Sequence, residues 1–293
     1  MKIGVISRKR SIYSTRRMME TIKDAGHSVV LINPERCQVI IDSHQPRLFA
    51  GKKVIEGLDL VFARIGTIFF EHGIAVAEYF QSHGIPVINP PESIILARDK
   101  IRSLQILSAH KVPVPKSATI RSLKNLRQAI KSVGGPPVVL KLSNGMQGNG
   151  VTLSETIESA ESMLGMLWGW DRQVMIQHYI AESRGIDIRI FVIGDSITAA
   201  MKRIARKKEF RSNIHRGGTG HAVELTTVEK QIALKSVHVL GLKVGGVDII
   251  RSEQGAVVVE VNGTPGFKGL EKTTGADIAS AILNYGLSCV KSK

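Results

Sequence analysis

The sequence predicts an α/β protein that begins with a parallel sheet and continues with antiparallel sheets. Over the first 90 residues, short apolar runs alternate with segments of helical period, which is the pattern of parallel βαβ units. Beyond residue 97, apolar runs follow one another across glycine-rich loops and tight turns, which is typical of antiparallel hairpins. We therefore expect a Rossmann-like N-terminal domain and a domain boundary near residue 97.

Four parallel strands and two helices are expected in the N-terminal domain. Ser14 is a plausible N-cap for the first helix, and Gly26 ends it. The first strand is not followed by G-x-G-x-x-G, so this sheet is not expected to be a standard dinucleotide site. The expected strands cover residues 2–7, 27–34, 58–66 and 84–90, and the helices cover 14–26 and 70–83.

Prolines delimit the helical region that follows. Pro90 and Pro91 favour its start. Pro113 and Pro115 stop it and favour extended backbone. Beyond it the sequence predicts a strand, a glycine-rich loop and a second strand over 136–153. The later elements are a helix at 155–167, a strand at 172–180, β regions at 187–205, 220–225 and 244–262, and a helix at 275–286.

The composition is that of a globular protein in a reducing compartment. Of the 293 residues, 43% are apolar and 22% are charged, which is ordinary for a domain with a packed core. No apolar run reaches the ~18 residues of a membrane helix, and the first seven residues read as a strand, not as a signal peptide. Cys37 and Cys289 have no metal-binding spacing. We therefore expect a cytoplasmic protein with no membrane partner.

The net charge is the one unusual bulk property. It is +15, with an isoelectric point near 10. Such a charge favours an anionic partner, which would be a nucleotide, a nucleic acid or an acidic protein. The alternative is a surface that is merely basic.

Two carboxylates and an amide are set into the apolar hairpin at 244–262. Glu260 and Asn262 are two residues apart, so both side chains point to one face of their strand. Pairing across the turn at 252–255 would bring Asp248 close to Glu260. Converging carboxylates repel each other unless a cation is present, and their hard oxygens are the ligands that Mg²⁺ prefers. The hairpin therefore predicts a magnesium site beside a nucleotide. The alternative is the solvated face of an edge hairpin.

A glycine-rich loop with a lysine on the preceding strand is the second candidate site. Gly145, Gly148 and Gly150 allow tight turns, and the N–H groups of such a loop can hold phosphate oxygens. Lys141 precedes the loop, which lacks the Walker pattern G-x-x-x-x-G-K-[ST]. A loop of this kind is often only a hairpin connection, but beside a metal site it indicates nucleotide binding.

The segment 201–218 is rich in lysine and arginine. We assign Arg203, Arg211 and Asn213 to the site, because arginines there would stabilise charge on a transferring phosphoryl group. The other cations, among them Arg206, are assigned to the surface. A nucleic-acid-binding patch is the rival interpretation, but carboxylates facing a phosphate backbone would repel it.

Motifs along nearly the whole chain together resemble one family. They are A-R-I-G at 63–66, A-R-D-K at 97–100, V-V-L-K-L followed by G-x-Q-G-x-G-V, Q-H-Y-I at 177–180, Asp187-x-Arg189, F-R-S-N-I-H-R-G-G at 210–218, G-V-D-I at 246–249, E-V-N-x-x-P-G at 260–266 and L-E-K-T-T-G at 270–275. In this combination they are similar to RimK-type ligases of the ATP-grasp superfamily of carboxylate–amine ligases.

The resemblance implies a division of the chain. Residues 1–97 would form a pre-ATP-grasp domain. Residues 98–185 would form the small ATP-grasp lobe with the glycine-rich loop, and residues 186–293 the C-terminal lobe with the metal site.

The resemblance also implies a role for each matching residue. The phosphates of ATP would be contacted by Lys100 and Lys141, and the acyl-phosphate would face Arg203. The metal ligands would hold two divalent ions, Mg²⁺ or Mn²⁺. Adenine would be read by the hinge Gln177, His178, Tyr179 and Ile180, the ribose by Asp187, and the nucleotide side would be lined by Arg211, Ser212 and Asn213.

The implied reaction is ligation through an acyl-phosphate. In this family glutamate is added to the C-terminus of ribosomal protein S-six of the small subunit, and the +15 charge would suit an acidic acceptor tail. We expect a homo-oligomer, a dimer or a tetramer. The alternative is a ligase for a small molecule or another carrier protein, LysX-like or glutathione-synthetase-like. His178 stands where the family usually has an acidic residue, and the loop S-N-G-M-Q-G-N-G is also atypical, so the chemistry would be kept and the preference for the amino acid or the acceptor would differ.

Overall fold

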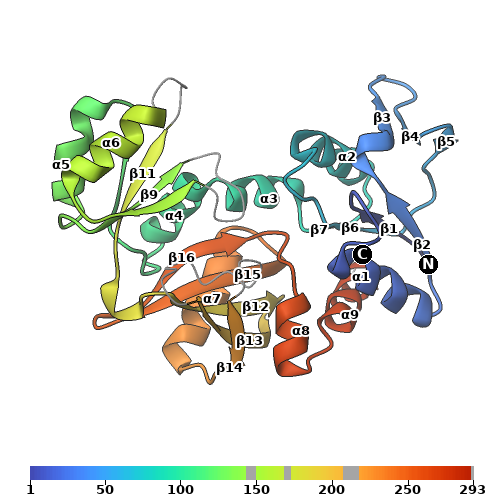
Figure 1. Cartoon of the computed structure of the whole chain (residues 1–293). Helices are drawn as coiled ribbons and strands as arrows, with labels where there is room; N and C mark the ends of the chain where they lie inside the picture. The colour runs from blue at the N-terminus through green and yellow to red at the C-terminus, as the bar shows by residue number, and fades with distance from the viewer. Residues whose placement is uncertain (143–149, 168–172, 207–217, 292–293) are drawn as a thin grey trace.

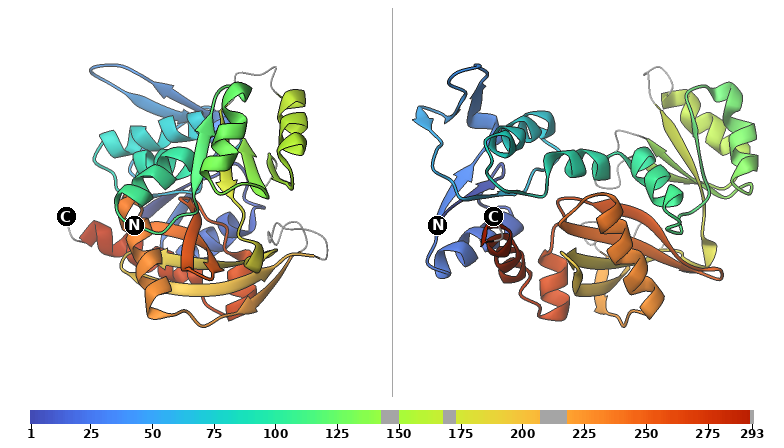
Figure 2. Two further views of the ribbon diagram at one scale, coloured as in Figure 1. Left: turned by 90° about the vertical axis from the view of Figure 1, so that its left-hand side faces the viewer. Right: turned by 180° about the vertical axis from the view of Figure 1, so that it is seen from behind.

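The computed structural model describes residues 1–142, 150–167, 173–206 and 218–291. Figure 1 shows the N-terminal domain at one side and a small lobe with two helices at the other. The C-terminal sheet lies between and below them. The view from behind in Figure 2 shows the same arrangement, with the last helix running back to the N-terminal domain.

The N-terminal domain is built on a four-stranded parallel sheet, as predicted. Its strand order is β2-β1-β6-β7, with parallel pairing throughout. The strands are β1 (Lys2–Ile6), β2 (Ser28–Ile32), β6 (Leu60–Ala63) and β7 (Val87–Ile88), and the helices are α1 (Tyr13–Asp24) and α2 (Phe70–Ser82). The predicted N-cap is wrong: Ile12 is the N-cap, and Ser14 is buried within the helix, which begins one residue before it.

A small antiparallel sheet between β2 and β6 is not anticipated by the sequence reading. It contains β3 (Cys37–Ile40), β4 (Arg47–Ala50) and β5 (Lys53–Val54), after a 3-10 turn at Pro34–Arg36. Its strands are two to four residues long, too short for a period of two to stand out in the sequence.

The predicted helical region after Pro90 is two helices. They are α3 (Pro91–Arg98) and α4 (Lys100–Ala109), separated by Asp99. The Asp99 side chain accepts hydrogen bonds of 3.0 Å from the backbone N–H groups of Ile101 and Arg102, and so caps α4. This cap places Lys100 at the first position of a new helix.

The small lobe is a four-stranded antiparallel sheet with two helices packed against it (Figure 1). The strand order is β10-β9-β11-β8, and the pairing is antiparallel throughout. The elements are β8 (Ser117–Ile120), a 3-10 turn at Leu123–Asn125, α5 (Leu126–Ser132), β9 (Val138–Leu142), β10 (Val151–Ser154), α6 (Ile157–Leu167) and β11 (Val174–His178).

The C-terminal lobe is a five-stranded antiparallel sheet in the order β14-β13-β12-β15-β16. A 3-10 turn at Ala181–Ser183 leads into it. The strands are β12 (Ile186–Ile193), β13 (Ser196–Ile204), β14 (Thr219–Ala222), β15 (Val244–Ser252) and β16 (Gly255–Asn262). The helices are α7 (Thr227–Val239), α8 (Lys268–Thr274) and α9 (Ile278–Lys291); α7 and α8 were not predicted, and α9 is the expected last helix.

The N-terminal sheet and the C-terminal lobe share one hydrophobic core. Ile3 and Phe62 of the parallel sheet belong to the same buried cluster as Phe191 and Ile282 of the C-terminal lobe. The predicted change from a parallel to antiparallel sheets is confirmed, whereas the exact domain limits remain predictions. Among the described residues, no helix has the length and apolarity needed to cross a bilayer.

Candidate active site

The hairpin of β15 and β16 brings the predicted metal ligands together. Asp248 lies opposite Glu260, and Gly246 lies opposite Asn262. Asp248 is buried, while Glu260 and Asn262 are half-buried. The expected approach of the two carboxylates is therefore present, on the strand pair at the edge nearest to α3 and α4 (Figure 1).

Two arginines from neighbouring strands close around Asp248. Register places Arg189 of β12 directly opposite it, and Arg189 donates from Nε and, at 2.6 Å, from Nη2 to the carboxylate. Arg203 of β13 lies 3.0 Å from Asp248 Oδ2 through Nη2. Burial alone would raise the pKa of Asp248, but the two guanidinium groups outweigh it and lower that pKa, so the carboxylate stays ionised.

The same network includes Asp187. Its two carboxylate oxygens accept from Nε and Nη2 of Arg203 at 2.5 and 2.6 Å, a bidentate pair between adjacent strands. Burial alone would lower the pKa of Arg203, but Asp248 and Asp187 outweigh it and raise that pKa. Arg203 is thus a permanent, fixed cation at the inner end of the site.

The outer half of the site draws on other parts of the chain. Lys100 Nζ, at the start of α4, is 2.8 Å from Glu260 Oε1. Burial lowers the pKa of Lys141 on β9 to about 8; Glu260 opposes this shift and Lys100 adds to it. Helix α4, β9 and the hairpin therefore place two lysines and two carboxylates within electrostatic range of each other. The contact of both lysines with ATP phosphates, which the resemblance implies, stays a prediction.

The charge on the carboxylates has internal partners. We expected their repulsion to require a bound cation, but Arg189, Arg203 and Lys100 already supply positive charge. Repulsion alone is therefore a weaker argument for a metal than the sequence suggested. The donor set still fits Mg²⁺, because Asp248, Glu260 and Asn262 offer only hard oxygens. The described residues hold no group of three or more His, Cys, Asp or Glu suited to a metal, so the Asn262 amide would complete the set.

The predicted adenine hinge follows the last strand of the small lobe. Gln177 is buried, and its Nε2 donates to Ser117 Oγ at 2.9 Å. His178 is exposed, and its backbone N–H donates to the carbonyl of Lys116. Tyr179 and Ile180 connect β11 to the 3-10 turn, and the Tyr179 hydroxyl is buried with no hydrogen-bond partner. The role of this hinge stays a prediction.

Several predicted nucleotide-binding residues lie outside the described residues. Gly150 is described; it is exposed and has a φ of +83°, which glycine adopts without strain. The predicted residues outside the description are Gly145, Gly148, Arg211, Ser212 and Asn213.

Two residues in the quoted motifs have structural roles that sequence reasoning missed. Arg189 donates to Asp248 and so orients its carboxylate. The alternation of side chains along β12 could have indicated this role, because Asp187 and Arg189 are two residues apart and share one face of the strand. Glu271 accepts from Tyr13 Oη at 2.7 Å and from the backbone N–H groups of Ile278 and Ala279 at the start of α9. The L-E-K-T-T-G motif therefore fixes the last helix.

The N-terminal domain holds both ends of the hairpin. The buried side chain of Asn89 donates to the carbonyls of Val244 and Gly263, each at 2.6 Å, and accepts from the N–H groups of Lys243 and Val244, each at 2.7 Å. Four hydrogen bonds from one amide thus fix the start of β15 and the residue after β16.

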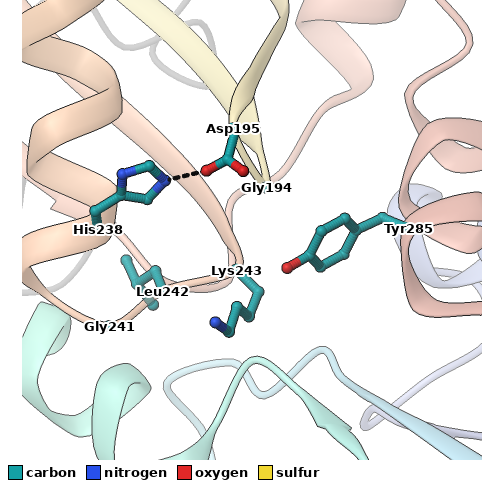
Figure 3. A pocket seen from close by; sticks show the side chains of 7 residues that line it. All are labelled: Gly194, Asp195, His238, Gly241, Leu242, Lys243 and Tyr285. Atoms are coloured by element: carbon teal, nitrogen blue, oxygen red, sulfur yellow. Dashed lines mark ion pairs between the residues drawn. The ribbon is translucent and has the colours of Figure 1, made fainter. Parts of the chain in front are cut away.

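A separate pocket of about 360 Å³ lies beside the turn between β12 and β13 (Figure 3). Its mouth carries an ion pair of 2.8 Å between His238 Nε2 and Asp195 Oδ1. Its lining residues are Gly194, Asp195, His238, Gly241, Leu242, Lys243 and Tyr285. None of them belongs to the carboxylate cluster, so the pocket is not part of the candidate site.

Comparisons with known proteins bear on the whole chain. The family model described as a RimK-like ATP-grasp domain matches residues 97–285, and the one described as a RimK PreATP-grasp domain matches residues 1–94. A curated relative from Pseudomonas paraeruginosa is 44% identical over 285 residues, 97% of this chain and 95% of the relative, and is named probable alpha-L-glutamate ligase. A relative of the same name from Picosynechococcus is 42% identical over the same coverage.

Solved structures share the fold at low sequence identity. The RimK domain ATP-grasp protein from Sphaerobacter thermophilus has a TM-score of 0.73 and 22% identity, covering 98% of this chain and all of that one. The ATP-grasp ligase PsnB, complexed with a minimal precursor, has a TM-score of 0.78 and 20% identity, with 98% of both chains covered. The predicted ATP-grasp fold with a pre-ATP-grasp domain is confirmed, and the protein is an ATP-dependent ligase. The chain belongs to the RimK family of ATP-grasp ligases.

Proposed function

We propose that this protein adds glutamate to the C-terminus of ribosomal protein S-six of the small subunit. Several relatives at 42–44% identity are named probable alpha-L-glutamate ligase, which supports glutamate as the amine. The observation that carries the proposal is the cluster in which Lys100, Lys141 and Arg203 surround the carboxylates of Asp248 and Glu260. Such a cluster suits a nucleotide triphosphate and an anionic reaction intermediate.

The chemistry has two steps. An oxygen of the acceptor carboxylate attacks the γ-phosphorus of ATP, the bond to ADP breaks, and an acyl-phosphate forms. The glutamate amine then attacks the acyl carbon, phosphate leaves with the C–O bond electrons, and the amine proton is released as the peptide bond forms. Phosphorylation is needed because an unmodified carboxylate oxygen is a poor leaving group.

The residues of the cluster divide this work. Lys100 and Lys141 would bind the phosphates, which requires Lys100 to leave Glu260. Arg203, held by Asp187, would face the negative charge of the acyl-phosphate. Two divalent ions, Mg²⁺ or Mn²⁺, held by Asp248, Glu260 and Asn262 would neutralise phosphate charge. Water must be kept away, because it would hydrolyse the acyl-phosphate.

A protein tail is the acceptor that the charge of the chain favours. The net charge of +15 would attract an acidic peptide. Among proteins of the same fold, the macrocyclase MdnC is described as bound to a precursor peptide, and PsnB as complexed with one. We expect the surface cations around Arg206, with Lys207 and Lys208 outside the described residues, to guide the acceptor. We also expect a homo-oligomer.

Intact-mass measurement tests the proposal. The protein is incubated with ATP, Mg²⁺, glutamate and the isolated small-subunit protein, and increments of one glutamate residue on that protein are expected. Glutamate-dependent ATP consumption with no mass change on the acceptor would reject the acceptor and favour the small-molecule or carrier-protein alternative. ATP consumption that does not depend on any amino acid would reject both ligase assignments.

A further inference from the structure

Arg64 is a half-buried cation, with a fully buried Nε, that the catalytic cluster does not use. It directly follows Ala63, the last residue of β6 in the parallel sheet. In open α/β sheets, ligands bind in the crevice beyond the carboxyl ends of the strands. Arg64 therefore stands where the N-terminal domain would meet a ligand.

The contacts of Arg64 leave its charge unpaired. Its Nη2 donates to the carbonyl of Pro265 at 2.6 Å, and its guanidinium carbon lies 5.5 Å from the centre of the Phe267 ring. Its Nε is buried and has no hydrogen-bond partner. Within the described part of the chain, no carboxylate forms an ion pair with it, whereas Arg189 and Arg203 each contact a carboxylate.

An unpaired guanidinium in such a place is energetically unfavourable. Burial lowers the pKa of Arg64 to about 10, so the group still carries its charge at neutral pH. A buried charge is costly unless an opposite charge and hydrogen bonds compensate it. Among the described residues this charge has no counter-ion, which favours a ligand that brings one.

The loops around this arginine lie against each other and carry two exposed glycines. Thr264 Oγ1 donates to the carbonyl of Ile65 at 2.9 Å, so the loop after β16 lies against the loop after β6. A Cβ atom built on Gly66 or on Gly266 would meet no atom within 4 Å. Pro265, the partner of Arg64, follows the predicted metal ligand Asn262 by three residues.

We propose that Arg64 binds a carboxylate of a substrate, one that is not phosphorylated in the reaction. This rests on the proposed ligase function. The reacting carboxylate must reach the phosphates at Lys100 and Lys141, whereas Arg64 follows β6 of the N-terminal domain and contacts the loop after β16 at Pro265. Two sources offer the required chemistry: the α-carboxylate of the incoming amino acid and a side-chain carboxylate of the acceptor.

Paired changes in enzyme and substrate test this assignment. The enzymes are wild type, Arg64→Gln, Arg64→Lys and, as a control, Arg98→Gln. Arg98 is more exposed than Arg64, but its guanidinium also lies over an aromatic ring, 3.9 Å from the centre of Phe70, and desolvation also lowers its pKa, with Glu71 opposing. The amines are glutamate and its α-amide; the acceptor peptides end in the same residue and carry upstream either glutamate or glutamine.

For one of the two substrate pairs, the amines or the acceptor peptides, we expect the effects of the enzyme change and the substrate change on kcat/KM to be non-additive. Losing a charge-assisted hydrogen bond costs about 10- to 100-fold in kcat/KM. Arg64→Gln should show that loss with glutamate, at an unchanged KM for ATP, and no further loss with the α-amide. Non-additivity with the acceptor peptides instead would assign the acceptor carboxylate. Arg64→Lys should recover part of the loss, and Arg98→Gln should keep full discrimination. Additive losses for both pairs would overturn the proposal.

Ligand-induced thermal stabilisation separates this inference from the proposed function. Each enzyme is heated with ADP and Mg²⁺, with and without glutamate or its α-amide, and with and without the two peptides. A rise in Tm that needs both the carboxylate and Arg64 supports the site, even if no acceptor is ever modified. A Tm rise that is the same in wild type and Arg64→Gln rejects the site, even if ligation is observed. Unliganded Arg64→Gln should melt no lower than wild type, since it loses a partly buried charge that has no carboxylate partner among the described residues.

Discussion

The inner and outer halves of the catalytic cluster are built differently. The inner carboxylate, Asp248, is 3% exposed and pairs with Arg189 and Arg203, which come from adjacent strands of the same sheet. The outer carboxylate, Glu260, has a side chain that is 34% exposed and pairs with Lys100 from a helix outside that sheet. Lys141, from the small lobe, belongs to the outer half as well.

This difference separates a fixed part of the site from an adjustable part. Strand register holds the inner ion pairs, so they cannot change without disturbing the sheet. The outer contacts depend on how α4 and β9 lie relative to the hairpin. A phosphate that arrives between the lysines would compete with Glu260 for them, whereas Asp248 would keep its arginines. Substrate binding should therefore reorganise the outer half only.

Removing the inner carboxylate should produce the largest loss of stability. Asp248→Asn keeps the shape but leaves Arg189 without a carboxylate, and breaking a buried pair costs about 3–5 kcal/mol. The free energy of unfolding without nucleotide, measured in urea, is expected to fall by about that amount. The double variant Asp248→Asn with Arg189→Met should recover part of the loss. Unchanged stability in the single variant would contradict the description of the inner half as fixed.

Loss of the Asn89 amide should be next in size. Asn89→Ala removes four hydrogen bonds and leaves backbone groups of Val244 and Gly263 unpaired, which we expect to cost about 2–4 kcal/mol. Asn89→Asp keeps the acceptor and loses the donors, so its loss should be intermediate. Urea unfolding of the three proteins measures this. If Asn89→Ala lowered the free energy of unfolding by no more than a substitution at an exposed position does, the ends of the hairpin would not depend on the N-terminal domain.

The inner half shows how far the sequence predicts the site. Strand parity predicted that Glu260 and Asn262 share a face. Counting back from the turn at 252–255, however, places Val259 opposite Asp248; a register shift between Asp248 and Ile249 brings Glu260 there instead. Such a bulge is common next to active sites, but the run at 256–261, which is apolar except for Glu260, carries no signal for it. The approach of the carboxylates was therefore predicted without its register.

Contacts between distant strands could not be predicted in the same way. The pairing of Arg189 with Asp248 joins β12 to β15, and no local turn fixes the register of strands so far apart. The position of Arg64 beside Pro265 depends likewise on the packing of two domains. By contrast, the resemblance assigned Lys100 and Lys141 to the same site as the carboxylates, and the structure brings them within electrostatic range of Glu260.

Removing the half-buried Lys141 of the outer half should stabilise the free protein. Burial lowers the pKa of Lys141 to about 8 from 10.5, so its charged form is disfavoured in the fold. The resulting loss in the free energy of unfolding is fully present below pH 8. It disappears as the pH rises from about 8 to 10.5, because over that range the unfolded chain binds more protons than the folded chain, so stability rises with pH. Lys141→Met should therefore gain about 1–3 kcal/mol at pH 7, and the gain should vanish by about pH 10.5.

Urea unfolding across that pH range, with wild type beside the variant, measures the difference. A gain that does not depend on pH would come from improved packing and not from the lysine charge. The same variant should bind ATP more weakly, if Lys141 contacts a phosphate as proposed. Equal ATP affinity in variant and wild type would remove Lys141 from the nucleotide site while leaving its effect on stability unchanged.

The smallest effect on stability is expected at the outer carboxylate. In Glu260→Gln the lost ion pair is partly exposed, and such pairs contribute about 0–1 kcal/mol. Salt should reduce the wild-type advantage further, because the screening length falls to about 3 Å at 1 M ionic strength. The contribution of Asp248, which is buried, should persist at that salt concentration. Activity is expected to respond differently from stability: Glu260→Gln should remain stable but lose most of its turnover, since the oxygens of Glu260 are proposed metal ligands.

If Glu260→Gln unfolds as easily as Asp248→Asn, and does so equally at low and high salt, then the outer half is as fixed as the inner one. Lys100 would in that case be a structural cation and would not be free to move to a phosphate.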